Sequence, residues 1–245
     1  MTESARPATD RPSERRTAAR RSVVWDAVRP LVVGAGEVLD IGGGTGGFAV
    51  RVAELGARVT VVDPCPDAVA ALARRARELD VEVTAVQGDV STLLDVCGPD
   101  SVDVVLCHGV LEVVDDRAAA LATLRRVLRP GGALSLLVAQ RHAAVVARAM
   151  AGHFTQALAL LESGPSERDG RTGHRFTESE VSDLLRRAGF DVEAVHGVRV
   201  FADLVPGSLL DLEPGATAAL VELERAVSER PEYRPLAAQL HLLAR

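Results

Sequence analysis

The segment VLDIGGGTGG, residues 38–47, constrains the possible fold of this chain more than any other stretch. It predicts a buried strand from Glu37 to Ile41 that ends in a glycine turn and leads into a helix beginning near Phe48. Such a turn after the first strand of an α/β sheet is where nucleotide-like ligands bind, because glycine lets the backbone approach a ligand closely. The same residues also fit the dinucleotide pattern G-x-G-x-x-G, so the turn alone leaves the ligand open. The glycines of this turn are Gly42, Gly43, Gly44, Gly46 and Gly47.

Length and composition favour one soluble domain. With 245 residues, of which 47% are hydrophobic, the chain can bury one large α/β core. A formal charge of −6 and a pI near 5.6 argue against a surface that is basic all over, so a nucleic-acid partner needs a local patch. The absence of a long apolar run and of a signal-peptide pattern predicts a cytoplasmic protein without a membrane segment. Cys65, Cys97 and Cys107 lack C-x-x-C spacing and are expected to be reduced core thiols, and no residues have metal-ligand spacing.

The N-terminal region divides into a polar arm and a helix. Residues 1–17 are rich in arginine and lack apolar periodicity, which predicts a mobile arm ahead of a single domain at residues 18–245. Apolar residues at helical spacing predict a helix from Ala18 to Val33, which precedes the first strand and is placed to fold over a ligand cleft. Arg20 lies near its start, where a solvated cation and a ligand contact both remain open.

Two acidic residues follow the second and third predicted strands. The run ARVTVVD ends in Asp63, about 20 residues past the glycines, where a carboxylate can accept both hydroxyls of a ribose. A helix from Pro66 to Leu79 and a strand from Val81 to Val86 then lead to Asp89. The alternatives are an ordinary acid at a strand end for Asp63 and a helix N-cap for Asp89.

The next elements complete a parallel sheet. A fourth strand is predicted from Val102 to Cys107, followed by a helix from about Arg117 to Leu128. The segment LRPGG, residues 128–132, ends that helix and precedes a fifth strand, residues 133–138. Five strands alternating with helices predict a doubly wound α/β sheet.

This succession of motifs resembles class I methyltransferases that use S-adenosylmethionine. The resemblance rests on D-x-G-G-G-x-G after the first strand, the acids after the second and third strands, and L-R-P-G-G before the fifth. It implies that Asp40 and the glycine turn border the amino-acid end of the cofactor, that Asp63 takes the ribose hydroxyls and that Asp89 takes the adenine amine. The cofactor-binding residues that it implies are Arg20, Asp40, Gly42, Gly43, Gly44, Gly46, Asp63, Pro64, Asp89, Val90, Cys107 and His108.

The second half of the chain completes a seven-stranded Rossmann-like sheet. Residues 138–175 carry apolar residues at helical spacing and predict a helical lid inserted after the fifth strand. Thr177 and Glu180 form a capping box at the start of a later helix. Strands are predicted within residues 190–200 and from Gln239 to Ala244, and the resemblance implies that the last one is antiparallel.

Several segments resemble one branch of the family more closely, the bacterial tRNA 5-carboxymethoxyuridine methyltransferases. These are LCHGVLEVVDD, LRPGGALSLL, AGHF, GVRVF and LHLLAR. The branch holds its cofactor with an arginine ahead of a tryptophan, and Arg20 matches it, which suits a bidentate guanidinium. The chain departs from the branch at Ala139 and Gln140, at residues 173–178 and at residues 237–239. These departures fall in the substrate half, so methyl transfer is better supported than the tRNA acceptor.

The acceptor determines which residues perform the chemistry. A carboxylate is already ionised at neutral pH and needs no general base, whereas a hydroxyl or amine needs one. Base candidates are His142, His153 and His174, for each of which a solvent-facing or packed imidazole is the alternative. An anionic acceptor needs guanidinium partners, with Arg199 preferred. The substrate candidates are Arg141, His142, Phe154, Arg175, Arg199 and Phe201, of which His142 and Arg199 are the catalytic candidates.

Three functions therefore remain open from the sequence. The first is a methyltransferase that acts on the carboxylate of a modified tRNA wobble uridine and releases S-adenosylhomocysteine. The second is a small-molecule O- or N-methyltransferase, which the acidic composition favours. The third is a non-catalytic regulatory partner that binds S-adenosylmethionine.

Overall fold

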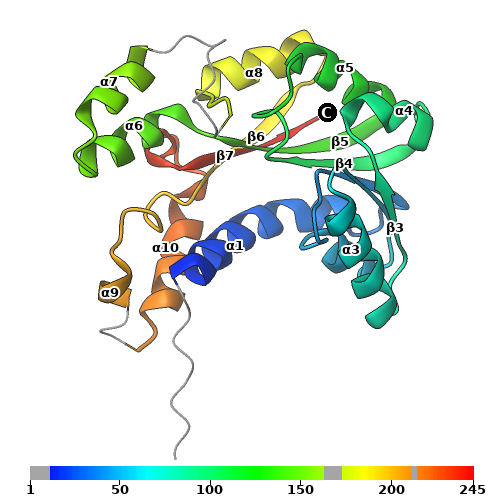
Figure 1. Cartoon of the computed structure of the whole chain (residues 1–245), viewed down its shortest axis with the longest axis horizontal. Helices are drawn as coiled ribbons and strands as arrows, with labels where there is room; N and C mark the ends of the chain where they lie inside the picture. Colours follow the sequence, from blue (N-terminus) through cyan, green and yellow to red (C-terminus); the bar gives the residue numbers. More distant parts are fainter. Residues whose placement is uncertain (1–11, 163–172, 211–213) are drawn as a thin grey trace, which may run out of the picture.

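Seven strands form one sheet in the order β3-β2-β1-β4-β5-β7-β6 (Figure 1). This computed structural model describes residues 12–162, 173–210 and 214–245. The strands β1 to β5 run parallel, and β7 is antiparallel to both of its neighbours, β5 and β6. The predicted Rossmann-like sheet is confirmed. The strands are β1 (Glu37–Ile41), β2 (Arg58–Asp63), β3 (Val83–Gln87), β4 (Val102–His108), β5 (Leu128–Ala139), β6 (Val192–Val198) and β7 (Gln239–Ala244).

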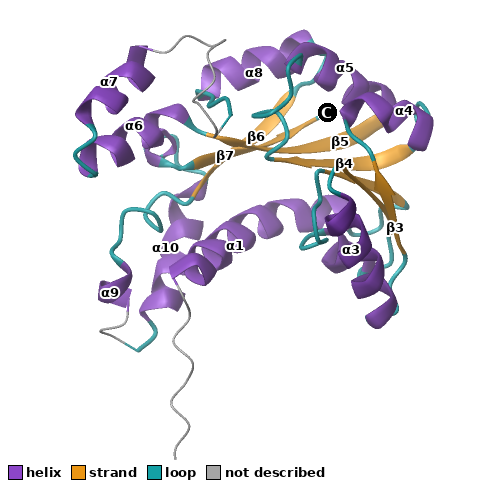
Figure 2. Ribbon diagram, in the orientation of Figure 1, coloured by secondary structure: helices purple, strands orange, loops and turns teal. Residues whose placement is uncertain are grey.

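Helices cover both faces of the sheet (Figure 2). On one face α4, α5 and α8 pack over the sheet, and on the other lie α1, α3 and α10. The helices are α1 (Pro12–Val32), α2 (Ala49–Ala53), α3 (Pro66–Glu78), α4 (Leu93–Val96), α5 (Arg117–Val127), α6 (Arg141–Met150), α7 (Phe154–Glu162), α8 (Glu178–Arg187), α9 (Gly207–Leu210) and α10 (Ala216–Ser228), with 3-10 turns η1 (Val90–Thr92) and η3 (Arg234–Leu236).

Alternation along β1 explains why both faces of the sheet are buried. Leu39 and Ile41 belong to the core cluster under α5 and α8, whereas Val38 belongs to the cluster under α1. Successive side chains of a strand point to opposite faces, so a central parallel strand must be apolar on both sides. Asp40 is buried on the α1 side, where it is the exception to that rule.

Two boundaries differ from the sequence predictions. The helix α1 begins at Pro12 rather than Ala18, so the described part of the predicted arm is helical and residues 1–11 lie outside the described residues. The prediction that LRPGG lies outside the fifth strand was wrong, because β5 starts at Leu128. Its pairing with β4 shifts register between Val102 and Val104, and such an irregularity accommodates Pro130, which has no N–H for the ladder.

The predicted lid forms two helices, α6 and α7, which pack against each other. Figure 1 places them at the end of the sheet near β6 and β7, away from α3 and α4. Residues 163–172 of this segment lie outside the described residues, so its covering of a cleft stays a prediction. The capping box that follows is confirmed, since the side chains of Thr177 and Glu180 each accept a hydrogen bond from the other residue's backbone N–H. In the described ranges, no helix is long and apolar enough to cross a membrane.

Candidate functional site

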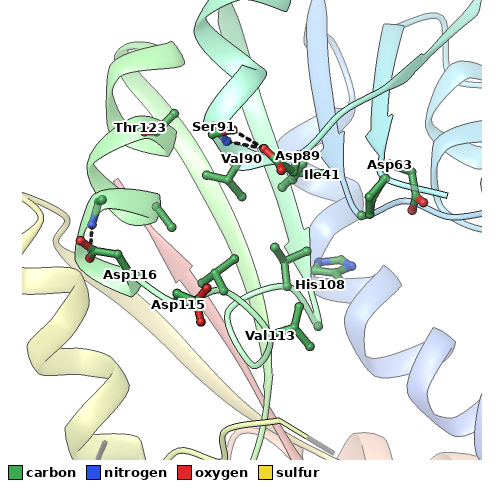
Figure 3. A pocket seen from close by; sticks show the side chains of 17 residues that line it. Ile41, Asp63, Asp89, Val90, Ser91, His108, Val113, Asp115, Asp116 and Thr123 are labelled. Atoms are coloured by element: carbon green, nitrogen blue, oxygen red, sulfur yellow. Dashed lines mark hydrogen bonds between the residues drawn. The ribbon is translucent and has the colours of Figure 1, made fainter. Parts of the chain in front are cut away.

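A cavity of about 830 Å³ opens at the carboxyl ends of β1, β2 and β4 (Figure 3). The loop after β4 and the start of α5 form its other wall. Ligands of open α/β sheets bind at this edge, so the fold places the cavity where the sequence predicts a cofactor. Its lining is Ile41, Gly42, Asp63, Pro64, Asp89, Val90, Ser91, His108, Gly109, Val110, Val113, Val114, Asp115, Asp116, Ala119, Ala120 and Thr123.

Asp63 joins the tip of β2 to the glycine turn after β1. Its Oδ2 accepts a hydrogen bond from the backbone N–H of Gly44 at 2.9 Å, and its Oδ1 accepts one from Cys65 at 2.9 Å. The residue is 7% exposed and still lines the cavity. A carboxylate has about four lone-pair directions, so Asp63 can hold the turn and also accept hydrogen bonds from a ligand.

Asp89 caps the short turn that follows β3. Its Oδ1 accepts hydrogen bonds from the backbone N–H of Ser91 at 2.8 Å and from the Ser91 hydroxyl at 2.5 Å. Thr92 completes a capping box, which confirms the N-cap alternative for this residue. The hydrogen bonds from Ser91 lower the pKa of the Asp89 carboxyl, so it is anionic at neutral pH while it faces the cavity.

The glycine turn contains glycines of two kinds. A Cβ at Gly43 would lie 2.6 Å from Oδ2 of the buried Asp40, so this glycine allows the turn to pack onto that carboxylate. Gly44 has φ +55° and nothing within 4 Å of the position of a Cβ. Its open side is where a bound group can approach the backbone, which fits a nucleotide-like cofactor. Elsewhere in the turn, Gly42 lines the cavity, and a Cβ at Gly46 would clash with the side chain of Leu72.

The substitution Gly44→Ala is expected to weaken cofactor binding beyond its effect on folding. The matched control is Gly98→Ala, because Gly98 also has positive φ and open space but precedes β4 at the opposite edge of the sheet. Each alanine in the left-handed region costs about 1–3 kcal/mol of stability. Only Gly44→Ala should also lower the affinity for S-adenosylhomocysteine, measured by calorimetry. Equal affinities in the two variants would contradict a ligand contact at Gly44.

His108 lies in the cavity wall and begins a row of buried polar side chains that runs across neighbouring strands of the sheet. Its Nε2 lies 2.9 Å from Oγ of Ser135 on β5, and that hydroxyl lies 2.8 Å from Nε2 of His241 on β7. His241 stacks on His196 of β6, with ring centroids 5.4 Å apart. The hydroxyl can donate to at most one of the two nitrogens, so at least one of the two imidazoles must donate its Nε2–H to Ser135 Oγ for both hydrogen bonds to form.

Burial keeps His241 and His196, the inner histidines of this row, neutral. Desolvation, then the nearby His108 and His196, lower the pKa of His241 well below its usual value, and desolvation lowers that of His196 as well. In the unfolded chain both groups take up a proton near pH 6.5. Between pH 6.5 and the lowered values the unfolded state therefore binds more protons, so stability must fall as the pH falls.

The substitution His241→Gln is expected to flatten this pH dependence. Below pH 6.5 each neutral buried histidine contributes a slope of up to about 1.4 kcal/mol per pH unit to the free energy of unfolding. Urea unfolding at pH 7.5 and pH 5.5 should show a smaller difference for the variant than for the wild type. His142→Gln, at an exposed histidine, should keep the wild-type difference. Identical slopes for all three proteins would show that His241 does not stay neutral.

The structure places about half of the predicted cofactor residues in the cavity lining and adds others to it. Gly42, Asp63, Pro64, Asp89, Val90 and His108 line the cavity, whereas Asp40, Gly43, Gly44, Gly46 and Cys107 do not. Cys107 is fully buried in the core of the sheet, and burial raises the pKa of its thiol. Sequence reasoning missed the carboxylates of Asp115 and Asp116. Asp116 also caps α5 through the backbone N–H of Ala119 (Figure 3). The signal that could have found them is the run LEVVDD directly after β4.

A second cavity, of about 330 Å³, lies at the same edge of the sheet. The register pairs Ala139 at the end of β5 with Gln239, and Gln239 with Val198 at the end of β6. Since β4 and β5 are parallel neighbours, the two cavities follow adjacent strand ends. The second cavity brings three guanidinium groups together with one carboxylate. Its charged lining residues are Arg148, Arg175, Arg199 and Asp203.

The predicted substrate residues divide between this cavity and other places. Arg175 and Arg199 line it, whereas Arg141 is buried, pairs with Glu180 at 2.8 Å and donates to the backbone of Arg175. Phe201 packs against Tyr233. The remaining ring, on Phe154, is 71% exposed.

The histidines predicted as bases lie outside the linings of both cavities. His142 and His153 are exposed. His174 is 2% exposed and meets Phe176 edge-on, with ring centroids 4.4 Å apart, which is the packed alternative for this residue. Arg20 lies in α1, but its side chain falls outside the described part of the structure. No group of three metal-ligating side chains is present among the described residues.

Comparison with known proteins agrees with this architecture. A family model described as a methyltransferase domain matches residues 39–136. The tRNA 5-carboxymethoxyuridine methyltransferase of Escherichia coli is 29% identical over 238 residues, which cover 92% of this chain and 87% of that protein. The ubiquinone biosynthesis O-methyltransferase of Xanthomonas campestris pv. campestris is 32% identical over 174 residues, 70% of this chain and 69% of that protein.

A solved structure supports the fold. The S-adenosylmethionine-dependent methyltransferase from Mesorhizobium loti superposes with a TM-score of 0.61 at 22% identity and covers 91% of this chain and 97% of its own. The strand order, the cavity at the carboxyl ends of β1, β2 and β4, and these relatives lead to one conclusion. The chain belongs to the S-adenosylmethionine-dependent methyltransferases and is an enzyme that uses S-adenosylmethionine as its methyl donor.

Proposed function

We propose that this enzyme methylates the carboxylate of 5-carboxymethoxyuridine in tRNA. The observation that carries the proposal is the arginine-lined second cavity beside the first one at the same edge of the sheet. A guanidinium is the group best suited to a carboxylate, because its N–H donors match the two oxygens. The tRNA 5-carboxymethoxyuridine methyltransferase of Escherichia coli, which this chain matches over 92% of its length, supports the same acceptor.

The charges of the two cavities support the assignment of the cofactor to the first cavity and of the acceptor to the second. Four carboxylates, those of Asp63, Asp89, Asp115 and Asp116, line the first cavity, which suits a cationic cofactor and repels an anionic acceptor. The second cavity has an excess of cations and attracts such an acceptor. An anionic acceptor group therefore belongs in the second cavity, with its nucleophilic oxygen directed toward the first.

In this proposal Asp63 and Asp89 hold the ribose and the adenine of the cofactor, and Gly44 faces its amino-acid end. S-adenosylmethionine, when bound, supplies a methyl group on a sulfonium, which is a good leaving group. The chain's own task is then to orient the acceptor, and alignment of reacting groups contributes up to about 7–11 kcal/mol. Arg199 and Arg175 hold the acceptor carboxylate, which is already ionised at neutral pH, so no side chain needs to remove a proton.

The experiment that tests this function is nucleoside mass spectrometry of tRNA from a strain that lacks the gene. The wild-type gene on a plasmid should restore the methyl ester of 5-carboxymethoxyuridine, and a gene carrying Asp63→Ala should not. An unchanged nucleoside profile in the deletion strain would contradict the tRNA acceptor.

A second candidate function is methylation of a small-molecule hydroxyl. It is favoured by His108, which lines the first cavity and shares the hydroxyl of Ser135 with His241, an arrangement that can accept a proton. The ubiquinone biosynthesis O-methyltransferase relative agrees with it. If this is the function, His108→Gln should abolish turnover and leave S-adenosylhomocysteine affinity within about threefold, since glutamine lacks the proton acceptor but introduces no charge.

A further inference from the structure

A buried carboxylate on α10 holds the turn that follows β6. Glu224 is 0% exposed, and its two oxygens accept hydrogen bonds from the backbone N–H groups of three successive residues. The distances are 2.8 Å from Val200, 2.9 Å from Phe201 and 2.7 Å from Ala202. A buried anion requires such compensation, and three charge-assisted bonds fix a short stretch of backbone firmly.

The residue just before this stretch has an unusual backbone conformation. Arg199 has φ +60°, and among the described residues only Asp80 and Asp100 share a positive φ without being glycine. Aspartate tolerates the left-handed region through local hydrogen bonds, whereas arginine adopts it only where its surroundings impose it. The carbonyl of Arg199 also accepts a hydrogen bond from the N–H of Ala238 at 3.1 Å, so the turn is held from the β7 side as well.

The side chain of Arg199 reaches the second cavity with one edge already engaged. Its Nε donates to Oδ2 of Asp203 at 3.1 Å, and its Nη2 donates to the same oxygen. Within the described residues Nη1 makes no hydrogen bond. A guanidinium has two edges that can grip a carboxylate, and Asp203 occupies the Nε side. The Nη1 end therefore remains for a ligand.

We propose that Glu224 is a positioning residue for the acceptor: by clamping residues 200–202 it presents the Nη1 end of Arg199 to the acceptor carboxylate. This inference rests on the proposed function of the second cavity. Asp203 also contributes in this proposal, because its carboxylate orients the guanidinium of Arg199 and leaves only one edge of that group for the acceptor. The site thereby selects a planar anion of carboxylate size. Glu224 itself touches neither substrate nor cofactor and acts through Arg199.

The test is a double-mutant cycle between Glu224→Gln and Arg199→Gln, with tRNA that carries 5-carboxymethoxyuridine as the acceptor. Glutamine keeps the shape of Glu224 but presents an N–H₂ group to backbone donors, so the turn should shift. Misplacement of a binding group costs roughly tenfold to hundredfold in kcat/KM. We expect a loss of that size in Glu224→Gln, with a raised KM for tRNA and unchanged calorimetric affinity for S-adenosylhomocysteine.

In the Arg199→Gln background, Glu224→Gln should cause no further loss, because the two residues act as one unit. Equal losses in both backgrounds, or a parallel loss of S-adenosylhomocysteine affinity, would overturn the proposal. The control is Glu222→Gln, an exposed glutamate on the same helix that pairs with Arg225, and it should behave as wild type.

A measurement on the wild-type protein keeps the inference testable if Glu224→Gln does not fold. The amides of Val200, Phe201 and Ala202 should exchange with solvent as slowly as those of β6, since a buried acceptor holds all three. Rapid exchange would contradict the clamp. If the wild type transfers no methyl group to tRNA, the proposed acceptor is wrong, whereas slow exchange would still support the clamp, so the two failures can be told apart.

Discussion

Asp63→Ala should lower the affinity for S-adenosylmethionine by at least about 100-fold, because each charge-assisted hydrogen bond that it removes contributes about 1.5–3 kcal/mol. The substitution removes the proposed ribose contacts and also the acceptors of the Gly44 and Cys65 amides, which hold the glycine turn. Isothermal calorimetry with S-adenosylhomocysteine measures the loss directly, without any knowledge of the acceptor.

Two further variants distinguish the effect of losing the Asp63 carboxylate from the effect of removing a negative charge elsewhere. Asp63→Asn keeps one acceptor oxygen and should fall between the wild type and Asp63→Ala. Glu54→Ala removes an equal charge from an exposed position and should bind as wild type. An Asp63→Ala protein that folds and retains wild-type affinity would contradict the assignment of the first cavity to the cofactor.

The second large effect is expected at Arg199. Arg199→Gln should lower kcat/KM for the tRNA acceptor by about 100-fold, since loss of one partner of a partly buried hydrogen-bonded ion pair costs 2–5 kcal/mol. Arg199→Lys should lose less, because lysine keeps the charge, although its ammonium lacks the planar pair of nitrogens that matches the two oxygens of a carboxylate. Affinity for S-adenosylhomocysteine should not change in either variant, since Arg199 lines the second cavity only.

Arg186→Gln is the matched control for this prediction. Arg186 also forms a local ion pair, with Asp183 at 2.5 Å, but it lies on the exposed face of α8. Initial-rate kinetics with purified tRNA should show wild-type values for this variant. A loss in Arg186→Gln as large as that in Arg199→Gln would mean that the effect comes from general surface charge.

The sheet and the strand-end acids were predictable because their signals are local. Buried parallel strands are mostly apolar runs, and Asp63 ends such a run in β2, whereas Asp89 follows β3, a partly buried strand at the edge of the sheet. The capping box at Thr177 was predictable for the same reason, since its partners are three residues apart. A turn prediction for LRPGG was wrong because proline and glycine also mark irregular strand pairing, and only the partner strand decides between the two.

The rest of the site depends on contacts between distant parts of the chain. Glu224 lies in the helical run ELERAVSER, where nothing local distinguishes it from the exposed Glu222, because its partners are backbone groups of residues 200–202. Arg141 looks like a substrate ligand from the sequence but is buried and pairs with Glu180, which lies beside it only in the folded protein. The fold and the cofactor-binding half can therefore be predicted from local patterns in the sequence, whereas the acceptor-binding half can be described only from the tertiary structure.

The most direct test of the proposed function is methyl transfer by the purified enzyme with a radiolabelled cofactor. Three fractions should be offered separately: tRNA that carries 5-carboxymethoxyuridine, tRNA that lacks this modification, and small molecules from a cell extract. Label should enter only the first fraction, in a mild-base-labile form typical of an ester, and Arg199→Gln should reduce its incorporation. Label that enters only the small-molecule fraction would contradict the tRNA acceptor.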